Sequence, residues 1–411
     1  MVLGLWLGGA LATHGETPAR WTRFRGPNGS GLSDATTIPV SFTTEDFNWM
    51  IELPGEGHSS PVIWEDKIFL TTVGGRPRSR QIVCLDVSDG HLRWAWRDPR
   101  FEEYGQHRDN SFASSTPTVD GERVYVVWTS GFRVIALALD HEGRLVWQRD
   151  LGNYSDEWGS AASPILVDDL LIFGNYQLTK GGFLTGLDIR NGATAWRLPR
   201  IYTYKASYST PVVFQSHSGD ANQVVFVSPS GGVTSVDAAT GHLLWEKRGL
   251  FNRRTVASPI IADGLIIAMS GSDMSEKRLA AIRPGGTVSG QEAQVVYTVS
   301  ARAHGVPTPV AYDHLMFLWH NNGIVSCLET RTGEELWKRR LGEGYYASPV
   351  CIDGKIYNIS REGTLVVLEA APEFKLLAEN KMPEGSHASL AVAGGRLYVR
   401  TYHHLISVGG D

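Results

Sequence analysis

The chain has 411 residues, of which 42% are hydrophobic and 20% are charged, and its formal net charge is −5. These proportions are typical of a folded globular protein, and 45 glycines with 13 tryptophans favour turn-rich all-β structure. The negative charge argues against a nucleic-acid partner. Phosphate binding requires a clustered basic surface, and the longest basic run is Lys338–Arg340.

Residues 2–12 form an apolar run that is too short to cross a bilayer as a helix. The run ends in Ala10-Leu11-Ala12, a small-residue pattern typical of a signal-peptide cleavage site. We therefore interpret residues 1–20 as a signal peptide or a disordered N-terminus. We expect no transmembrane segment and a periplasmic or secreted protein. The alternative is that this run is a buried N-terminal segment.

Eight units follow, and each opens with Ser/Thr-Pro or a close variant ahead of an apolar strand. The openings are Ser60-Pro61, Thr116-Pro117, Ser163-Pro164, Thr210-Pro211, Ser258-Pro259, Thr308-Pro309, Ser348-Pro349 and the degenerate Ser389-Leu390. A tight turn such as Asp120-Gly121 comes next, since Asp-Gly supplies the positive φ angles that two-residue hairpins need. The turn predicts a second strand in each unit, for example Arg123–Trp128.

The second half of each unit carries a phrase that returns along the chain, in which a Leu/Val-Asp strand end and a glycine turn precede a tryptophan strand. It is seen at Leu85–Trp94, Leu187–Trp196, Val236–Trp245 and Leu328–Trp337. A period of about 40–55 residues indicates a propeller, solenoid or array. Four short meandering strands per unit predict a propeller blade. The fold class is therefore all-β, an eight-bladed propeller of four-stranded antiparallel blades.

The two chain ends complement each other. The eighth unit stops near Val408 without a tryptophan strand, whereas residues 47–53 read as a fourth strand with no first three before it. We expect this N-terminal strand to complete the last blade beside residues 387–408 and so remove exposed sheet edges. Residues 47–411 are then one propeller domain, and residues 21–46 are an N-terminal extension.

The tryptophans of the fourth strands occupy one register, which predicts structural packing between adjacent blades. They are Trp49, Trp94, Trp147, Trp196, Trp245 and Trp337. Two units lack the residue: the fifth has a degenerate last strand near Val295–Val299, and the seventh has Leu376-Leu377.

The pattern of Val236–Trp245, with Asp237, Thr240-Gly241 and Trp245, resembles the repeat of the pyrroloquinoline quinone (PQQ)-like, BamB-like eight-bladed propellers. The resemblance covers about residues 45–409 and implies the fold more than the function. One branch of the family contains dehydrogenases that use PQQ with calcium, and the other contains cofactor-free scaffolds. The phrase Phe24–Gly31 looks like a motif of exported, uncharacterised members.

The chain departs from both branches. The large alcohol dehydrogenases carry adjacent cysteines above PQQ, but Cys84, Cys327 and Cys351 have no cysteine neighbours, and no calcium ligands or catalytic aspartate align. A lipobox cysteine, expected in BamB, is missing from the N-terminal run. We interpret the three cysteines as buried apolar residues, with a Cys327–Cys351 disulfide left open, and we expect no metal site.

Residues just ahead of the Ser/Thr-Pro openings differ from unit to unit, while the openings scarcely vary. Because every blade of a propeller starts near the axis, we expect the variable residues to form a ring at one mouth of the central channel. The candidate ring contains His58, Asn110, Trp158, Lys205 beside Tyr204, Arg253 beside Arg254, Arg302 with His304, Tyr345 beside Tyr346, and His387. Such residues suit a small anionic or planar ligand. The alternative is a hydrated channel without a ligand.

The insertion at Asp98–Asn110 is read as a solvated mixed-charge loop, with a cover over the channel mouth as the alternative. No catalytic motif is present. The sequence therefore predicts a non-catalytic binding or scaffold protein that acts through its loop-bearing face, needs no cofactor, and is a monomer. Its expected partners are a protein, a glycan or the small ligand above. The alternative is a PQQ-dependent oxidoreductase acting on an alcohol or sugar with PQQ and calcium.

Overall fold

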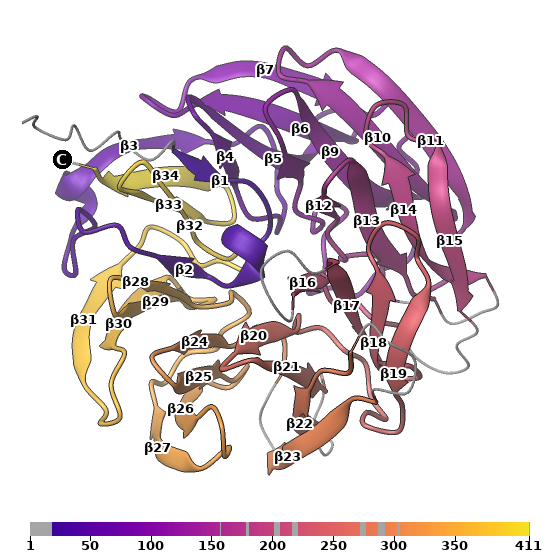
Figure 1. Cartoon of the computed structure of the whole chain (residues 1–411). Coiled ribbons are helices and arrows are strands. Elements are labelled where there is room, and N and C mark those ends of the chain that lie inside the picture. Colours follow the sequence, from indigo (N-terminus) through magenta and orange to yellow (C-terminus); the bar gives the residue numbers. More distant parts are fainter. Residues whose placement is uncertain are drawn as a thin grey trace, which may run out of the picture.

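The structure is a computed structural model, and it describes residues 19–156, 158–177, 181–200, 206–215, 221–271, 277–286, 292–301 and 305–410. Eight sheets are arranged around one axis, and each is a blade built on four antiparallel strands of the repeat (Figure 1). We number the blades 1 to 8 in the chain order of their first strands. The predicted fold class is confirmed.

The first strand of each blade lies at the axis and contacts the first strand of at least one neighbouring blade. These inner strands are β4 (Val62–Trp64), β8 (Thr118–Val119), β12 (Ile165–Val167), β16 (Val212–Phe214), β20 (Ile260–Ala262), β24 (Val310–Tyr312), β28 (Val350–Ile352) and β32 (Ala391–Ala393). The second strands are β5 (Lys67–Gly74), β9 (Arg123–Ser130), β13 (Leu170–Asn175), β17 (Gln223–Ser228), β21 (Leu265–Ser270), β25 (Leu315–Trp319), β29 (Lys355–Ile359) and β33 (Arg396–Arg400).

The third and fourth strands complete each blade outward. The third strands are β6 (Ser79–Asp86), β10 (Arg133–Asp140), β14 (Gly182–Asp188), β18 (Gly232–Asp237), β22 (Lys277–Arg283), β26 (Ile324–Glu329), β30 (Thr364–Glu369) and β34 (His404–Gly409). The fourth strands are β7 (Leu92–Arg97), β11 (Leu145–Asn153), β15 (Thr194–Arg200), β19 (Leu243–Lys247), β23 (Gln294–Ala301), β27 (Glu335–Arg340), β31 (Leu376–Lys381) and, for blade 8, β3 (Phe47–Glu52).

Blade 8 closes the propeller by joining the two chain ends. Strand β3 pairs antiparallel with β34, and Met50 lies opposite Ile406. The sheet order β3-β34-β33-β32 places the N-terminal strand at the outer edge, as expected. The pairing removes an exposed sheet edge that would otherwise be free to associate with another chain.

The N-terminal extension is woven into the propeller instead of standing apart from it. Strand β1 (Arg20–Trp21) adds to β4 of blade 1, and β2 (Leu32–Ser33) pairs in parallel with β28 of blade 7. Two 3-10 turns, η1 (Pro27–Gly29) and η2 (Thr44–Asp46), are the helical elements of the described residues. The segment with η1 lies inside the ring of blades (Figure 1).

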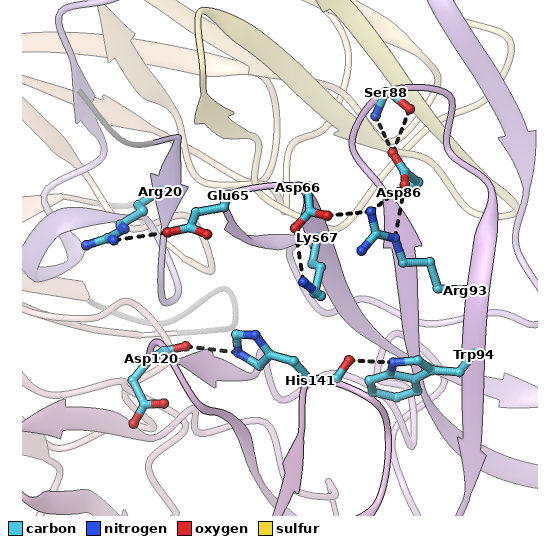
Figure 2. Close-up of polar contacts among 10 residues, drawn as sticks. All are labelled: Arg20, Glu65, Asp66, Lys67, Asp86, Ser88, Arg93, Trp94, Asp120 and His141. Carbon is cyan, nitrogen blue, oxygen red and sulfur yellow. Dashed lines mark hydrogen bonds and ion pairs between the residues drawn. The ribbon is translucent and has the colours of Figure 1, made fainter. Parts of the chain in front are cut away.

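The repeated tryptophans tie each blade to the next, as expected from their common register. The Trp94 indole donates to the carbonyl of His141, at the turn between the third and fourth strands of blade 2, over 2.8 Å (Figure 2). Trp147 makes the same bond to Ile189 and Trp196 to Ala238. Each indole thereby satisfies a carbonyl that the hairpin leaves unpaired.

The aspartate of the repeat shapes that turn. Asp86 accepts hydrogen bonds from the backbone N–H and the hydroxyl of Ser88, at 2.8 and 2.6 Å, and is paired with Arg93 (Figure 2). These bonds, above all those from Ser88, lower the pKa of Asp86 to about 2. Asp188 and Asp237 accept from turn N–H groups in the same way.

The two units without a tryptophan lack it for different structural reasons. In blade 5 Tyr297 occupies the register, and its hydroxyl donates to the Thr330 carbonyl of blade 6 over 2.6 Å. In blade 7 Ala378 holds the position. Blade 8 has no turn between its third and fourth strands, because these are the two chain ends, so blade 7 has no such carbonyl to satisfy.

Apolar side chains fill the spaces between blades, and the central strands are buried on both faces. Cys84, Cys327 and Cys351 lie in this core as free thiols, and burial raises the pKa of each to about 12. The Cys327–Cys351 disulfide that the sequence left open is not formed. In the described part of the chain, no helix has the length and apolar character needed to span a membrane.

Candidate functional site

A closed ring of hydrogen bonds surrounds the axis. In every unit, the backbone N–H of the opening Ser or Thr donates a hydrogen bond to the side-chain hydroxyl of the equivalent Ser or Thr in the next unit. The ring runs Ser60, Thr116, Ser163, Thr210, Ser258, Thr308, Ser348, Ser389 and back to Ser60, over 2.9 to 3.4 Å. We call it the hydroxyl ring. It explains why these openings scarcely vary along the chain.

A cavity of about 470 Å³ lies on the axis, and every residue of the hydroxyl ring except Ser60 lines it. A second tier of its wall is formed by the residues two positions before each ring residue. These are His58, Ser114, Ala161, Tyr208, Val256, Val306, Tyr346 and His387, one from each blade. The volume is in the range of small-molecule sites.

Four residues of the predicted ring line this cavity: His58, Asn110, Trp158 and His387. At two other positions the sequence offered a pair, and the second member of each pair, Arg254 or Tyr346, lines the cavity while Arg253 and Tyr345 do not. Tyr345 instead packs into the core between blades 6 and 7, against Trp319.

The remaining members of the predicted ring, Lys205, Arg302 and His304, lie outside the described residues. The lining also includes residues that sequence reasoning missed, namely Phe24, His107, Asp109 and Tyr208. A constant offset of two residues from the Ser/Thr opening would have identified Tyr208 and would have selected Tyr346 over Tyr345. No such signal marks Phe24, which reaches the axis from the extension.

Aromatic and imidazole rings gather on one side of the cavity. The His387 ring lies 4.4 Å from that of His58 and 4.7 Å from that of Tyr346. Burial, followed by the Arg361 charge, lowers the pKa of His387 to about 4, and burial and His387 itself lower that of His58. Both imidazoles are therefore neutral at pH 7, each with one donor and one acceptor nitrogen.

Asp109 joins three of these groups at the mouth. Its carboxylate accepts from the Tyr346 hydroxyl at 3.3 Å, pairs with Arg361 at 3.4 Å, and lies 3.6 Å from Nδ1 of His107. Arg361 also stacks over the Tyr346 ring at 4.5 Å. Asp109 thus links the insertion of blade 1 to residues of blade 7, and much of its hydrogen-bonding capacity is already used.

The insertion at Asp98–Asn110 is held against the propeller and lines the cavity, so the cover over the mouth describes it better than a solvated loop. Its anchor is the fully buried ion pair between Asp98 and Arg80, with an N–O distance of 2.9 Å. Arg80 also donates to the Thr129 carbonyl and stacks over Trp128 at 3.9 Å. A buried pair with these added bonds fixes the loop in one geometry.

Trp158 is the centre of the opposite side of the mouth. His107 stacks on it with ring centroids 4.3 Å apart, and Arg254 lies over it at 4.0 Å. The Asn110 amide donates to the Trp158 carbonyl over 2.7 Å. Within the described residues, Nε1 of Trp158 and Nε of Arg254 are buried donors without a hydrogen-bond partner.

The N-terminal extension closes the other end of the axis, and we call residues 22–31 the axial plug. Arg25 is fully buried and donates to the carbonyls of Thr308 and Pro309 in blade 6, each over 2.9 Å. Arg23 donates to the Pro211 carbonyl of blade 4 over 2.6 Å. Because these carbonyls follow the hydroxyl ring along the chain, the plug lies beyond the ring. Phe24 faces the cavity as its floor.

Glycines allow the plug to fold so tightly. Gly26 has φ of 65°, and a Cβ there would lie 2.5 Å from the Trp21 ring. Gly31 has φ of 72°, and a Cβ there would meet the Arg25 guanidinium at the same distance. Only glycine meets both conditions.

The described residues do not fit the PQQ–calcium pair of the dehydrogenase branch. Asp109 is the one carboxylate among the described lining residues, and it already contacts Tyr346 and Arg361. No group of three His, Cys, Asp or Glu side chains in the described chain is arranged to hold a metal ion. The three cysteines are buried between blades, and none of them is among the described residues that line the cavity.

Comparison with known proteins agrees with the repeat and with the fold. A family model described as outer membrane protein assembly factor BamB matches residues 49–284 and 321–408. The chain belongs to this BamB family of β-propellers. BamB of Moranella endobia (strain PCIT) is 22% identical over 274 residues, which are 62% of this chain and 66% of that protein.

BamB of Yersinia pestis is 24% identical over 227 residues, which are 53% of this chain and 50% of that protein. The chain therefore spans between half and two thirds of the length of these relatives. Among solved structures, BamB from Moraxella catarrhalis superposes with a TM-score of 0.63 at 18% identity, covering 88% of this chain and 96% of that one.

The quinohemoprotein alcohol dehydrogenase from Comamonas testosteroni superposes with a TM-score of 0.66 at 12% identity, covering 97% of this chain and 82% of that one. At such low identities the likeness to both solved structures shows the fold alone. This structural likeness does not distinguish a scaffold protein from an enzyme.

Proposed function

We propose that this chain is a non-catalytic, exported binding or scaffold protein of the cell envelope that acts through the face on which the cavity opens. We call this the mouth face. The observation that carries the proposal is the contrast between the uniform hydroxyl ring and the varied second tier, from His58 to His387. Identical or closely similar residues in every blade are expected where side chains hold the fold together. Residues that differ from blade to blade around one opening are expected where side chains recognise a partner.

The charge of the mouth face supports a partner with acidic groups. A smaller pocket beside the cavity mouth is lined by Arg78, Arg108 and Arg361, with Glu56 and Asp109 as its acidic residues. Arg108 and Arg78 are exposed. Arg78 is paired with Glu103 and Arg361 with Asp109, whereas Arg108 forms no ion pair within the described residues. Arg108 is therefore the residue on this face that we expect to contact an acidic protein segment or an anionic glycan.

The cell-envelope location is inferred from the BamB relatives in other organisms, whose names describe outer membrane protein assembly. That role belongs to those proteins. For this chain we infer the coarser property, binding of a macromolecular partner in the envelope.

Site-specific crosslinking in cells tests the proposal. A photoreactive residue at Gln106, on the mouth face, should give one discrete adduct with a partner. The same residue at Arg144, in the turn between the third and fourth strands of blade 2 and thus at the opposite end of the propeller, should give none. Adding Arg78→Glu and Arg108→Glu should abolish the Gln106 adduct. Equal adducts from both positions, or an adduct unaffected by charge reversal, would contradict the proposal.

A PQQ-dependent oxidoreductase stays a second prediction, supported by the fold shared with the Comamonas testosteroni enzyme. Calorimetric titration of the mature protein with PQQ, with and without calcium, tests it directly. Binding of one PQQ per chain at micromolar or lower concentration would favour the enzyme. Since Asp109 is already engaged, we expect calcium to add nothing to the measured affinity.

A further inference from the structure

A second hollow lies at the end of the axis opposite the mouth face, where the axial plug meets blades 3, 4 and 5. We call this hollow of about 800 Å³ the basal groove. Its lining includes Arg23 and Asn28 of the plug, the inner-strand residues Leu166, Val213 and Ile261, and Arg283 at the end of β22. Two arginines therefore line one groove, and no carboxylate is among its described lining residues.

The groove exists because the plug covers the inner strands unevenly. In blade 2 the Val119 N–H donates to a plug carbonyl over 2.9 Å, and in blade 4 Asn28 exchanges two hydrogen bonds with the backbone of Val213, each over 2.8 Å. Leu166 and Ile261 hold the equivalent positions of blades 3 and 5, and within the described chain the plug forms no hydrogen bond with their backbone. Their side chains are only half-buried, whereas Val119 is 1% exposed. The groove thus has an apolar wall on each side of Asn28.

Arg23 is a buried cation that uses little of its hydrogen-bonding capacity. The residue is 6% exposed, and its Nη2 donates to the Pro211 carbonyl over 2.6 Å. Its Nε is enclosed without a partner, whereas Nη1 forms no hydrogen bond with the described residues and is not among the enclosed atoms. Since Arg23 lines the groove, Nη1 is the nitrogen that is open to it. Burial lowers the pKa of Arg23 to about 9, so the side chain is still charged at pH 7.

The neighbouring arginine of the plug shows how a buried guanidinium is satisfied without a ligand. Arg25 is also fully buried, but all three of its nitrogens donate to backbone carbonyls of the plug and of blade 6, over 2.9 to 3.2 Å. It lines neither the axial cavity nor the basal groove. Burying a charge is costly unless such bonds compensate it. Arg23 lacks them, and an anion in the groove would supply acceptors to its open side.

Arg283 adds a second unpaired cation at the rim of the groove. Its side chain is exposed and forms no ion pair or hydrogen bond in the described part of the chain. Asp263, in the turn after the inner strand of the same blade, is already paired with His314 and Arg331. The two positive charges of the groove are therefore not compensated by its own lining, and they favour a ligand with two negative charges.

We propose that the basal groove binds a phosphate monoester, whose phosphate accepts hydrogen bonds from Arg23 and whose organic group lies on the apolar walls at Leu166 and Ile261. Arg283 neutralises the second charge from the rim. Guanidinium groups suit phosphate oxygens, and a monoester carries about two negative charges at pH 7. A free phosphate ion would leave most of the groove and its apolar walls unused. The site goes beyond the partner binding proposed for the mouth face, and either one can exist without the other.

Calorimetric titration of the mature protein with phenyl phosphate is the first test. Phenyl sulfate keeps the ring but carries a single charge, and methyl phosphate keeps the phosphate but lacks the ring. We expect one site per chain for phenyl phosphate. Each analogue should bind roughly tenfold more weakly, the loss expected for one charge-assisted contact or for the burial of one ring.

Matched variants assign the two arginines. Arg23→Gln should weaken binding of phenyl phosphate and of phenyl sulfate, each by roughly tenfold or more. Arg283→Gln should instead reduce the preference for the phosphate over the sulfate. Because the Arg283 side chain is exposed, this variant keeps the test valid even where Arg23→Gln loosens the plug.

Two further variants are controls for charge alone. Arg190→Gln removes an exposed cation from the turn between β14 and β15, at the same end of the propeller, and Arg108→Gln removes one from the mouth face. Both should bind like the wild type. Circular dichroism and thermal melts establish that each variant is folded.

Vesicles distinguish two sources of the monoester. We expect a soluble ester, because Arg23 is recessed below the surface. Sedimentation of the wild type, but not of Arg23→Gln, with phosphatidylcholine vesicles that contain phosphatidate would assign the phosphate to a lipid headgroup instead.

Three results would overturn the assignment. The first is that the wild type binds neither phenyl phosphate nor the phosphatidate vesicles. The second is equal affinity for phenyl phosphate and phenyl sulfate. The third is that folded Arg23→Gln and Arg283→Gln variants both bind like the wild type.

Discussion

The backbone N–H of Ser389 donates to the hydroxyl of Ser60 over 3.2 Å, across 329 residues of chain, and this bond closes the hydroxyl ring. At the outer edge of the same blade, β3 pairs with β34. The propeller is thus closed twice at the junction of its ends, once at the axis and once at the rim. Neither closure has a counterpart in local sequence, since both join residues from opposite ends of the chain.

Ser60→Ala should destabilise the protein by about 1–3 kcal/mol, because it leaves the buried N–H of Ser389 without an acceptor. Ser60→Thr should be nearly neutral, since threonine serves at three other positions of the ring. The free energy of unfolding in urea measures both. A Ser60→Ala variant as stable as Ser60→Thr would show that the ring contributes nothing.

The pairing of β3 with β34 at the outer edge of blade 8 leads to a second prediction about stability. Removing residues 1–55 deletes β3 together with the plug, and should replace the single cooperative unfolding transition with a broad one. A truncation that removes residues 1–18 alone keeps both elements and should unfold cooperatively. Calorimetry of the two truncated proteins distinguishes these results, and unchanged melting of the shorter one would contradict the role assigned to β3.

Alanine substitutions at two glycines can separate the energetic cost of a steric clash between neighbouring blades from the cost of backbone strain. Gly241 and Gly264 have φ of 69° and 72°, so alanine is strained at both. At Gly241 a Cβ would lie 2.4 Å from the Trp196 ring, whereas at Gly264 it would meet nothing within 4 Å. We expect Gly264→Ala to destabilise by about 1 kcal/mol and Gly241→Ala by about 3 kcal/mol or more, measured by urea unfolding. If both variants lost the same free energy of unfolding, the Trp196 ring would be able to move away from the added methyl group without a measurable cost.

The repeat made the fold readable from sequence, because the Asp–turn–Gly–Trp phrase performs the same local task in each blade. Asp86 orders its turn, and Trp94 reaches the next one. The site was only partly readable. Of the pair Tyr345 and Tyr346, only Tyr346 lines the cavity, because adjacent side chains of extended backbone point to opposite sides and Tyr345 is turned into the core.

The plug shows the limit of reading a chain locally. Arg25 is bound by carbonyls of Thr308 and Pro309, almost three hundred residues away, and nothing in its neighbourhood marks it as buried. Its flanking glycines indicate tight turns but not where those turns lie. That the extension forms the floor of an axial cavity could be learned only from the three-dimensional arrangement.

The buried histidines of the cavity predict a pH dependence of stability. The pKa of His387 is lowered to about 4, against about 6.5 in an unfolded chain, and that of His58 is also lowered. Between these pH values the unfolded state binds protons that the folded state does not. Stability contributed by the neutral imidazoles is therefore full above pH 7 and is lost as the pH falls from about 6.5 toward 4.

His387→Phe keeps a planar ring in this position and removes the titrating group. Between pH 7.5 and 5, the free energy of unfolding of the wild type should fall by about 1–2 kcal/mol more than that of the variant. Urea unfolding at both pH values measures the difference. The window lies above the range in which carboxylates with lowered pKa, such as Asp86, take up protons, so their loss does not mask the effect. Parallel slopes for the two proteins would mean that the His387 imidazole is charged in the folded state, which the burial of both its nitrogens and the nearby Arg361 charge argue against.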